Sequence, residues 1–194
     1  MSQLKLIVGL GNPGPSYSET RHNAGQWFVE ELARQYAIPL KPESKFFGLY
    51  GEGFIDNQKV RLLVPTTFMN KSGQAVAAVN KFYKIELDEV LVAHDELDFE
   101  PGIVKLKTGG GHGGHNGLRD IIACSANQKG FHRLRIGIGH PGDAKLVSNW
   151  VLKKAPNADH QKIISCVDES ARYIKQMVAG EWAQAMNQLH SFKA

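Results

Sequence analysis

The stretch from Leu4 to Gly14, L-K-L-I-V-G-L-G-N-P-G, decides the fold class of this chain. Its apolar and β-branched run predicts a buried strand, and the Gly and Pro residues that follow predict a turn. Apolar residues then recur at helical spacing, at Ala24, Trp27, Phe28, Leu32 and Tyr36. The order strand, loop, helix is the unit from which α/β sheets are built.

The same alternation continues along the chain. Strands are predicted at 46–55 and 59–64, where the turn residues Asp56 and Asn57 indicate a hairpin, and again at 89–93, 104–107 and 133–138. Helical spacing marks 75–83, a segment from Leu118, and the tail from about 157 onward. We therefore expect residues 1–194 to form a single-domain α/β/α sandwich. Its sheet should be mixed, mostly parallel and twisted, with a C-terminal helical segment.

Composition narrows the classes of protein. A chain of 194 residues with 42% hydrophobic content can enclose one substantial core. The net charge of +4 permits a nucleic-acid partner without proving one. The apolar runs are too short for a membrane span and no secretion leader is recognisable, so we expect a cytoplasmic protein. Cys124 and Cys166 lack the CxxC spacing of zinc sites, and buried thiols are expected.

Two glycine-rich segments resemble nucleotide-binding motifs, but both are poor matches. The segment from Gly9 to Gly14 fits G-x-G-x-x-G, yet Pro13 removes a backbone N–H where a pyrophosphate needs donors. The loop from Gly109 to Gly114 lacks the G-K-[ST] ending of a P-loop. We expect no nucleotide cofactor.

A metal site is a rival interpretation. His112 and His115 have H-x-x-H spacing, and His94, Asp95 and Glu96 lie elsewhere in the chain. The spacing falls on a glycine loop, and a catalytic zinc needs three protein ligands. We expect no bound metal.

Several polar residues follow directly after predicted strands. Because carboxyl ends of parallel strands meet at one edge, these residues should share a rim where a base, its orienter and neutral donors come together. Most of them also have a structural alternative: Asn12 could close an Asx turn, Asn70 and Asn116 could cap helices, His22 near a helix start could be structural, and Asp95 could be an ordinary turn or capping carboxylate. The set comprises Asn12, His22, Asn70, Asp95, His115 and Asn116.

Several long blocks closely resemble the bacterial peptidyl-tRNA hydrolases. They are K-L-I-V-G-L-G-N-P-G from Lys5, T-R-H-N-A-G from Thr20, P-T-T-F-M-N-K-S-G from Pro65, H-D-E-L-D from His94, G-G-G-H-G-G-H-N-G-L from Gly109, and F-H-R-L-R-I-G-I-G-H-P from Phe131. They span residues 5 to 141 in the family's order, and the resemblance thins after Gly142.

The resemblance implies an enzyme that hydrolyses the ester between peptide and tRNA, with no cofactor and no obligate protein partner, as a monomer. By position, it implies His22 as the catalytic base and Asp95 as its orienting carboxylate. The substrate-binding residues it implies are Asn12, Tyr17, Met69, Asn70, His115 and Asn116. Its partner would be peptidyl-tRNA, bound through the tRNA acceptor end and the nascent peptide.

Basic residues at a spacing of two on two predicted strands form a candidate phosphate-binding surface, and the resemblance implies that Lys107 and Arg135 contact tRNA. Each pair points to one side of its strand and could hold phosphates. They are Lys105, Lys107, Arg133 and Arg135. A metal-dependent hydrolase and a non-catalytic RNA-binding domain of the same shape remain the alternatives.

Overall fold

A computed structural model of the chain describes residues 2–194 and contains one seven-stranded sheet with the strand order β2-β3-β4-β1-β5-β7-β6. The strands are β1 (Leu6–Gly9), β2 (Lys41–Glu43), β3 (Gly48–Ile55), β4 (Gln58–Pro65), β5 (Val90–Glu96), β6 (Val104–Thr108) and β7 (His132–Gly137). The mixed sheet expected from the sequence is thus confirmed.

Parallel pairing is confined to the centre of the sheet. Strands β4, β1, β5 and β7 run parallel, whereas β2, β3 and β6 pair antiparallel at the two flanks. The expected predominance of parallel pairs therefore holds only for the four central strands. The physical reason on one flank is the tight turn at Asp56 and Asn57, both in the left-handed region, which joins β3 to β4 as a hairpin.

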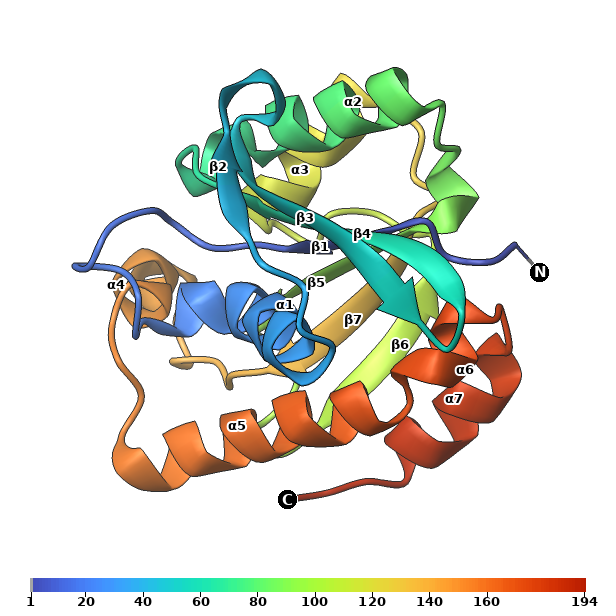
Figure 1. Cartoon of the computed structure of the whole chain (residues 1–194). Coiled ribbons are helices and arrows are strands. Elements are labelled where there is room, and N and C mark those ends of the chain that lie inside the picture. Colours follow the sequence, from blue (N-terminus) through green and yellow to red (C-terminus); the bar gives the residue numbers. More distant parts are fainter. Residues whose placement is uncertain (1) are drawn as a thin grey trace.

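Helices cover both faces of the sheet, which gives the predicted three layers (Figure 1). Helices α2 and α3 lie on one face, and α1, α5, α6 and α7 lie on the other. Their bounds are α1 (Ala24–Gln35), α2 (Ser72–Tyr83), α3 (Asn116–Cys124), α4 (Val147–Val151), α5 (Asn157–Arg172), α6 (Ile174–Val178) and α7 (Trp182–His190). The chain after β7 is therefore the expected helical segment.

Strand alternation divides the core into two hydrophobic clusters. In β1, Leu6 and Val8 pack toward α2 and α3, whereas Ile7 packs toward α1 and α5. All three side chains are fully buried. A central strand that is covered on both faces reads as a continuous apolar run, which explains the sequence of β1.

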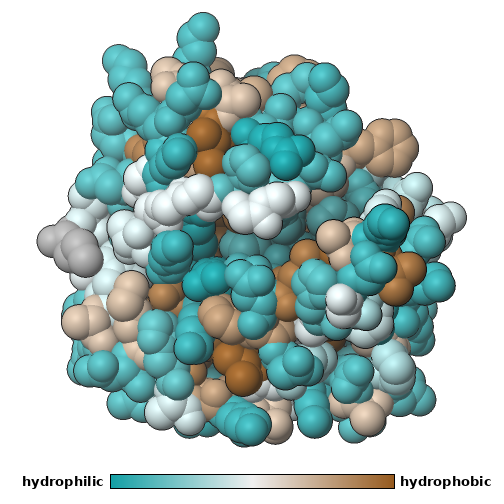
Figure 2. Space-filling view, turned by 180° about the vertical axis from the view of Figure 1, so that it is seen from behind, coloured by the Kyte–Doolittle hydropathy of each residue, from teal (hydrophilic) through white to brown (hydrophobic). Residues whose placement is uncertain are grey.

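One face of the molecule is mainly polar. Seen from behind, the molecule presents mostly hydrophilic side chains with smaller hydrophobic patches between them (Figure 2). Within residues 2–194, no helix has the length and apolar character needed to cross a membrane. Both cysteines are free, and Cys166 is buried as expected, but Cys124 is exposed because it ends α3 on the side away from the core.

Candidate functional site

Segments that follow the central parallel strands meet at one edge of the sheet and line a cavity of about 450 Å³. Asn12 follows β1, while Met69 and Asn70 lie in a short 3-10 helix after β4. Asp95 belongs to β5 itself, which extends to Glu96 and so is longer than the predicted strand 89–93. His22 reaches the cavity from the 3-10 helix Arg21–Asn23, before α1. The convergence of polar residues that the sequence predicted is present.

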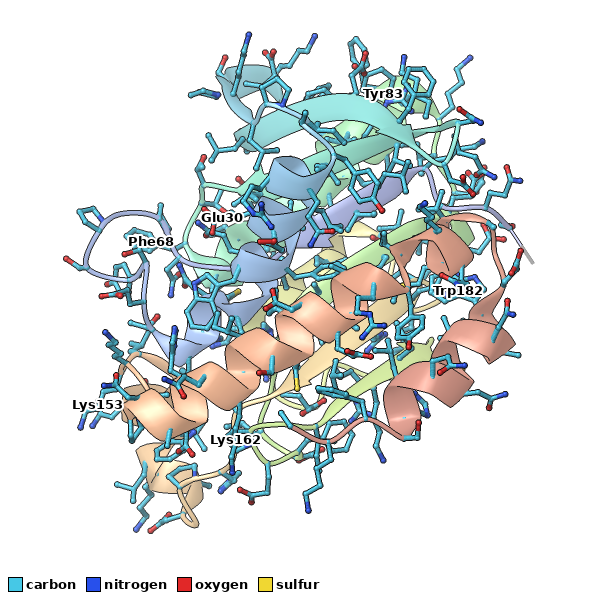
Figure 3. The ribbon with its side chains drawn as sticks, turned by 60° about the horizontal axis from the view of Figure 1, so that its bottom comes forward. Glu30, Phe68, Tyr83, Lys153, Lys162 and Trp182 are labelled. Atoms are coloured by element: carbon cyan, nitrogen blue, oxygen red, sulfur yellow. The ribbon has the colours of Figure 1, made fainter. Side chains whose placement is uncertain are left out.

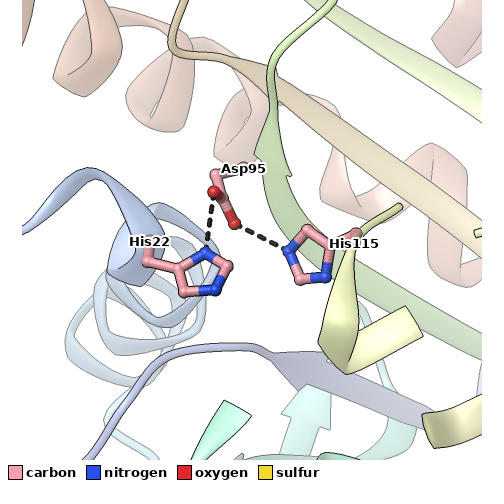
Figure 4. Close-up of side chains that lie close together, drawn as sticks. All are labelled: His22, Asp95 and His115. Carbon is pink, nitrogen blue, oxygen red and sulfur yellow. Dashed lines mark hydrogen bonds and ion pairs between the residues drawn. The ribbon is translucent and has the colours of Figure 1, made fainter. Parts of the chain in front are cut away.

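His22 and Asp95 form a buried pair in the wall of this cavity (Figure 4). Nδ1 of His22 lies 2.9 Å from Oδ2 of Asp95, and their side chains are 10% and 2% exposed. An ionised carboxylate only accepts hydrogen bonds, so Nδ1 carries the proton. In the neutral ring, the lone pair is then on Nε2, the nitrogen that Asp95 leaves free. This is the arrangement of a general base held by an orienting acid.

The electrostatics of the pair reinforce this tautomer. Burial lowers the pKa of His22, but the Asp95 carboxylate raises it by more, so the net pKa lies above 6.5. Burial in turn raises the pKa of Asp95, yet His22 and His115 lower it well below its usual range. Asp95 therefore remains ionised whenever His22 is able to act as a base.

His115 is bonded within the protein through both ring nitrogens. Its Nε2–H donates to Oδ1 of Asp95 at 2.8 Å (Figure 4). Its Nδ1 accepts from the backbone N–H groups of Gly117 and Leu118 at 3.1 and 3.3 Å and so caps α3. The cap of α3 is thus His115 and not Asn116, contrary to the structural alternative considered above. Its ring lines the cavity, but no ring nitrogen is free for a substrate.

Asn12 is held by a second network, and it does not close a local Asx turn. Its Oδ1 accepts the backbone N–H of Met69 at 2.7 Å. Its backbone N–H donates to Oδ1 of Asn23 at 2.8 Å, and its carbonyl accepts from Nδ2 of Asn23 at 3.0 Å. Because Oδ1 is committed, the amide orientation is defined, and Nδ2 is the donor left for a ligand in the cavity.

The other two asparagines are exposed and line the same cavity from two elements that contact each other, the 3-10 helix Met69–Lys71 and α3. Asn70 lies within the 3-10 helix, and α2 is preceded by Lys71, so Asn70 is no helix cap. Asn116 begins α3, and its Oδ1 accepts from Arg119 at 3.0 Å, which leaves Nδ2 as its available donor. Both residues therefore offer neutral amide groups to a ligand.

Apolar side chains complete the cavity wall. Met69 is 4% exposed, whereas Phe68 is 60% exposed and stands at the rim. Tyr17 does not line the cavity. It packs edge-on against Phe68, with ring centroids 6.3 Å apart, so any contact of Tyr17 with substrate lies outside the enclosed space.

Helix α4 and the residue after it supply a wall that the sequence did not indicate, through Val147 and Val151 of the helix and through Leu152. Figure 3 shows Phe68 and Lys153, just after α4, at one end of the molecule and Trp182 at the other. Arg21, next to His22, is buried beneath α4: its guanidinium lies 3.6 Å from the Trp150 ring centroid and donates to the Trp150 carbonyl at 2.9 Å. Arg21 thereby links the segment that carries His22 to the apolar wall formed by α4.

The four predicted tRNA-binding residues share one face of the β6–β7 flank, but they differ in their contacts. Lys107 and Arg135 line a second cavity of about 300 Å³ beside the first. Arg135 also donates to Glu96 at 2.8 Å. Lys105 lies outside this cavity, with its amine 5.0 Å from the ring centroid of Phe99.

Arg133 also lines the second cavity, but it is 2% exposed. Its guanidinium donates to the backbone carbonyls of Gly110 and Gly111 and, at 3.2 Å, to that of Lys129. Burial lowers its pKa to about 10. Its two terminal nitrogens thus hold the glycine loop and Lys129, whereas its buried Nε has no partner among residues 2–194, so a phosphate contact by Arg133 stays a prediction.

Three side chains of the site are close enough together to share a metal ion. One ligand atom from each of His22, Asp95 and His115 lies within 4.8 Å of the others. The hydrogen bonds oppose this use. Nδ1 of His115 accepts from backbone N–H groups, so the proton of the neutral ring is on Nε2, the atom that would have to bind the metal. Metal binding would require loss of the α3 cap or an imidazolate.

A buried histidine–aspartate pair beside amide donors, at the carboxyl edge of an α/β sheet, is a site of the kind that hydrolases use to activate water. The family model described as peptidyl-tRNA hydrolase matches residues 6–194, so the similarity continues well beyond Gly142. The chain belongs to the peptidyl-tRNA hydrolase family.

Individual members of this family are similar to the chain over nearly their whole length. The chain is 61% identical to the peptidyl-tRNA hydrolase of Colwellia psychrerythraea over 98% of each chain. It is 58% identical to that of Pseudomonas syringae pv. syringae over 100% of each. The crystal structure of the Acinetobacter baumannii peptidyl-tRNA hydrolase superposes with a TM-score of 0.97 at 54% identity and covers 100% of this chain and 97% of that one.

Proposed function

We propose that this protein hydrolyses the ester between the peptide and the 3′-terminal ribose of peptidyl-tRNA and thereby recycles tRNA in the cytoplasm. Residues 1–194 would act as one monomeric domain. The single observation that carries the proposal is the 2.9 Å contact between His22 Nδ1 and Asp95 Oδ2 in the wall of a cavity large enough for a peptide ester. Family membership supplies the substrate class.

In the proposed reaction, His22 acts as the general base and no covalent enzyme intermediate is needed. Nε2 of His22 takes a proton from water as the water oxygen attacks the ester carbonyl carbon. Asp95 stabilises the imidazolium that forms. The tetrahedral intermediate then collapses, the bond from carbon to the ribose oxygen breaks, and His22 returns the proton to that oxygen. The products are the free peptide acid and tRNA with a free hydroxyl.

The neutral amides would stabilise the negative charge on the former carbonyl oxygen. Asn12 is the candidate whose amide is oriented most firmly, because its bonds to Met69 and Asn23 already orient Nδ2 as a donor. A preorganised donor of this kind typically contributes on the order of 10²–10³ in rate. Asn70 and Asn116 would hold the peptide backbone without reading side chains, and Met69 would contact the ester region.

Binding of tRNA would use the flank of β6 and β7. Lys107 and Arg135 in the smaller cavity and Lys105 beside it would contact acceptor-stem phosphates, while the glycine loop lies between the two cavities. Charge-assisted contacts of this type position a nucleic acid without reading its sequence.

One assay separates this proposal from its two alternatives. Purified protein should hydrolyse N-blocked aminoacyl-tRNA at the same rate with and without EDTA. Loss of activity in EDTA, restored by zinc, would identify a metal-dependent hydrolase. Binding of the tRNA without hydrolysis under either condition would identify a non-catalytic RNA-binding domain.

A further inference from the structure

The two cavities adjoin at the glycine loop and the end of β5. Four residues line both of them: His94, Glu96, His112 and Gly113. Any ligand that extends from the base His22 in the larger cavity to Lys107 in the smaller one must pass this junction. The hydrogen-bonding groups at the junction therefore select what can lie there.

Three of the four shared residues have no side-chain donor that is free to bind a ligand. Glu96 is a carboxylate that already accepts from Arg135. His94 donates Nδ1–H to the carbonyl of Asp95 at 2.9 Å, and burial together with His115 and Arg133 lowers its pKa to about 3, so Nε2 carries no proton. Gly113 has no side chain. Only His112 is left.

His112 is oriented by its own loop to present a donor. The backbone N–H of Gly114 donates to Nδ1 of His112 at 2.9 Å, so the proton of the neutral ring is on Nε2. This return of the chain requires Gly113 and Gly114 to adopt φ of 57° and 86°. Behind it, Arg133 holds the carbonyls of Gly110 and Gly111. A half-buried and pre-oriented N–H thus stands between the cavities.

We propose that His112 is a further tRNA contact, and that its Nε2–H donates to the phosphodiester linking the last two nucleotides of the substrate. The inference rests on the proposed function. If the ester lies beside His22 and acceptor-stem phosphates lie beside Lys107, the phosphate of the terminal nucleotide is the group closest to the junction. A phosphate oxygen is an anionic acceptor, so it is a suitable partner for the single N–H of His112. The edge of a nucleobase is a poorer partner, because it carries donors as well as acceptors.

The test uses two minimal substrates, an N-acetyl-aminoacyl ester of adenosine and the same ester carrying a 5′-phosphate. The measured quantity is the preference, the ratio of kcat/KM for the phosphorylated ester to that for the other. We expect His112→Ala to lower this preference roughly 10-fold, the scale of one hydrogen bond to a charged group. His112→Gln, which restores an N–H donor, should recover part of it.

His140 provides a matched control. Its Nδ1 likewise accepts a backbone N–H two residues later, that of Gly142 at 2.9 Å, but the residue is exposed and lines neither cavity. His140→Ala should leave the preference as it is in the wild type. An unchanged preference in His112→Ala, or an equal fall in His140→Ala, would overturn the proposal. If the wild type hydrolyses neither ester nor N-blocked aminoacyl-tRNA, the proposed function itself has failed.

Discussion

His115 and Asp95 are joined by a 2.8 Å hydrogen bond from Nε2 to Oδ1, and the other ring nitrogen of His115 caps helix α3. His115 therefore joins the Asp95 carboxylate to the start of α3. We expect His115→Ala to lower kcat about 10-fold and to destabilise the fold by about 1–3 kcal/mol, because a buried carboxylate oxygen and two N–H groups lose their partner. Steady-state kinetics and urea unfolding measure both effects. A change confined to KM would instead indicate direct substrate contact.

His22 and Asp95 should behave as one unit in catalysis. His22→Ala is expected to reduce kcat by roughly 10²–10⁴, the usual range for a positioned general base, with little change in tRNA affinity. Because an orienter has nothing to orient once the base is gone, the double variant His22→Ala/Asp95→Asn should be hardly slower than His22→Ala. Strictly multiplicative losses in the double variant would show that Asp95 has a separate role.

The pH profile tests the electrostatic coupling of the same pair. The pKa of His22 is raised above 6.5, and the protonated ring cannot accept a proton from water. As the pH is lowered, kcat/KM should therefore start to decrease while the pH is still above 6.5. Asp95→Asn removes the charge that raises the pKa and leaves the burial that lowers it. The acidic limb of the variant should therefore move to lower pH. A limb that stays in place, or moves upward, contradicts the assignment of His22 as the base.

The basic residues of the β6–β7 flank should separate into two groups. Lys107→Ala and Arg135→Ala should each raise KM for full-length peptidyl-tRNA. Each should also reduce the slope of log KM against log salt concentration by about 1, the value expected for one lost phosphate contact. Arg133→Ala should instead destabilise the protein, because the glycine-loop carbonyls lose their donor. Kinetics between about 50 and 200 mM salt and thermal unfolding distinguish the two outcomes. If Arg133→Ala changed only the salt slope, the guanidinium would be a phosphate contact after all.

Much of the architecture is determined locally by the sequence. The apolar run of β1 and the helical spacing of α1 depend only on which residues seek burial, so both elements were predictable. The rim of polar residues followed from the rule that parallel strands end at a common edge. The resemblance of several motifs to one family then indicated His22 and Asp95, since spacing alone left the structural alternatives open.

Tertiary structure decided what each polar side chain is free to do. Arg133 and Arg135 have the same charge and the same strand face in the sequence, yet one is committed to loop carbonyls and the other lines a cavity beside a carboxylate. The H-x-x-H spacing does not show what the ring nitrogens of His112 and His115 bind, but of these two residues only His115 bonds through both ring nitrogens. A sequence states which donors and acceptors exist. Whether they are already satisfied depends on backbone groups that are distant along the chain and meet only when the sheet and its loops have assembled.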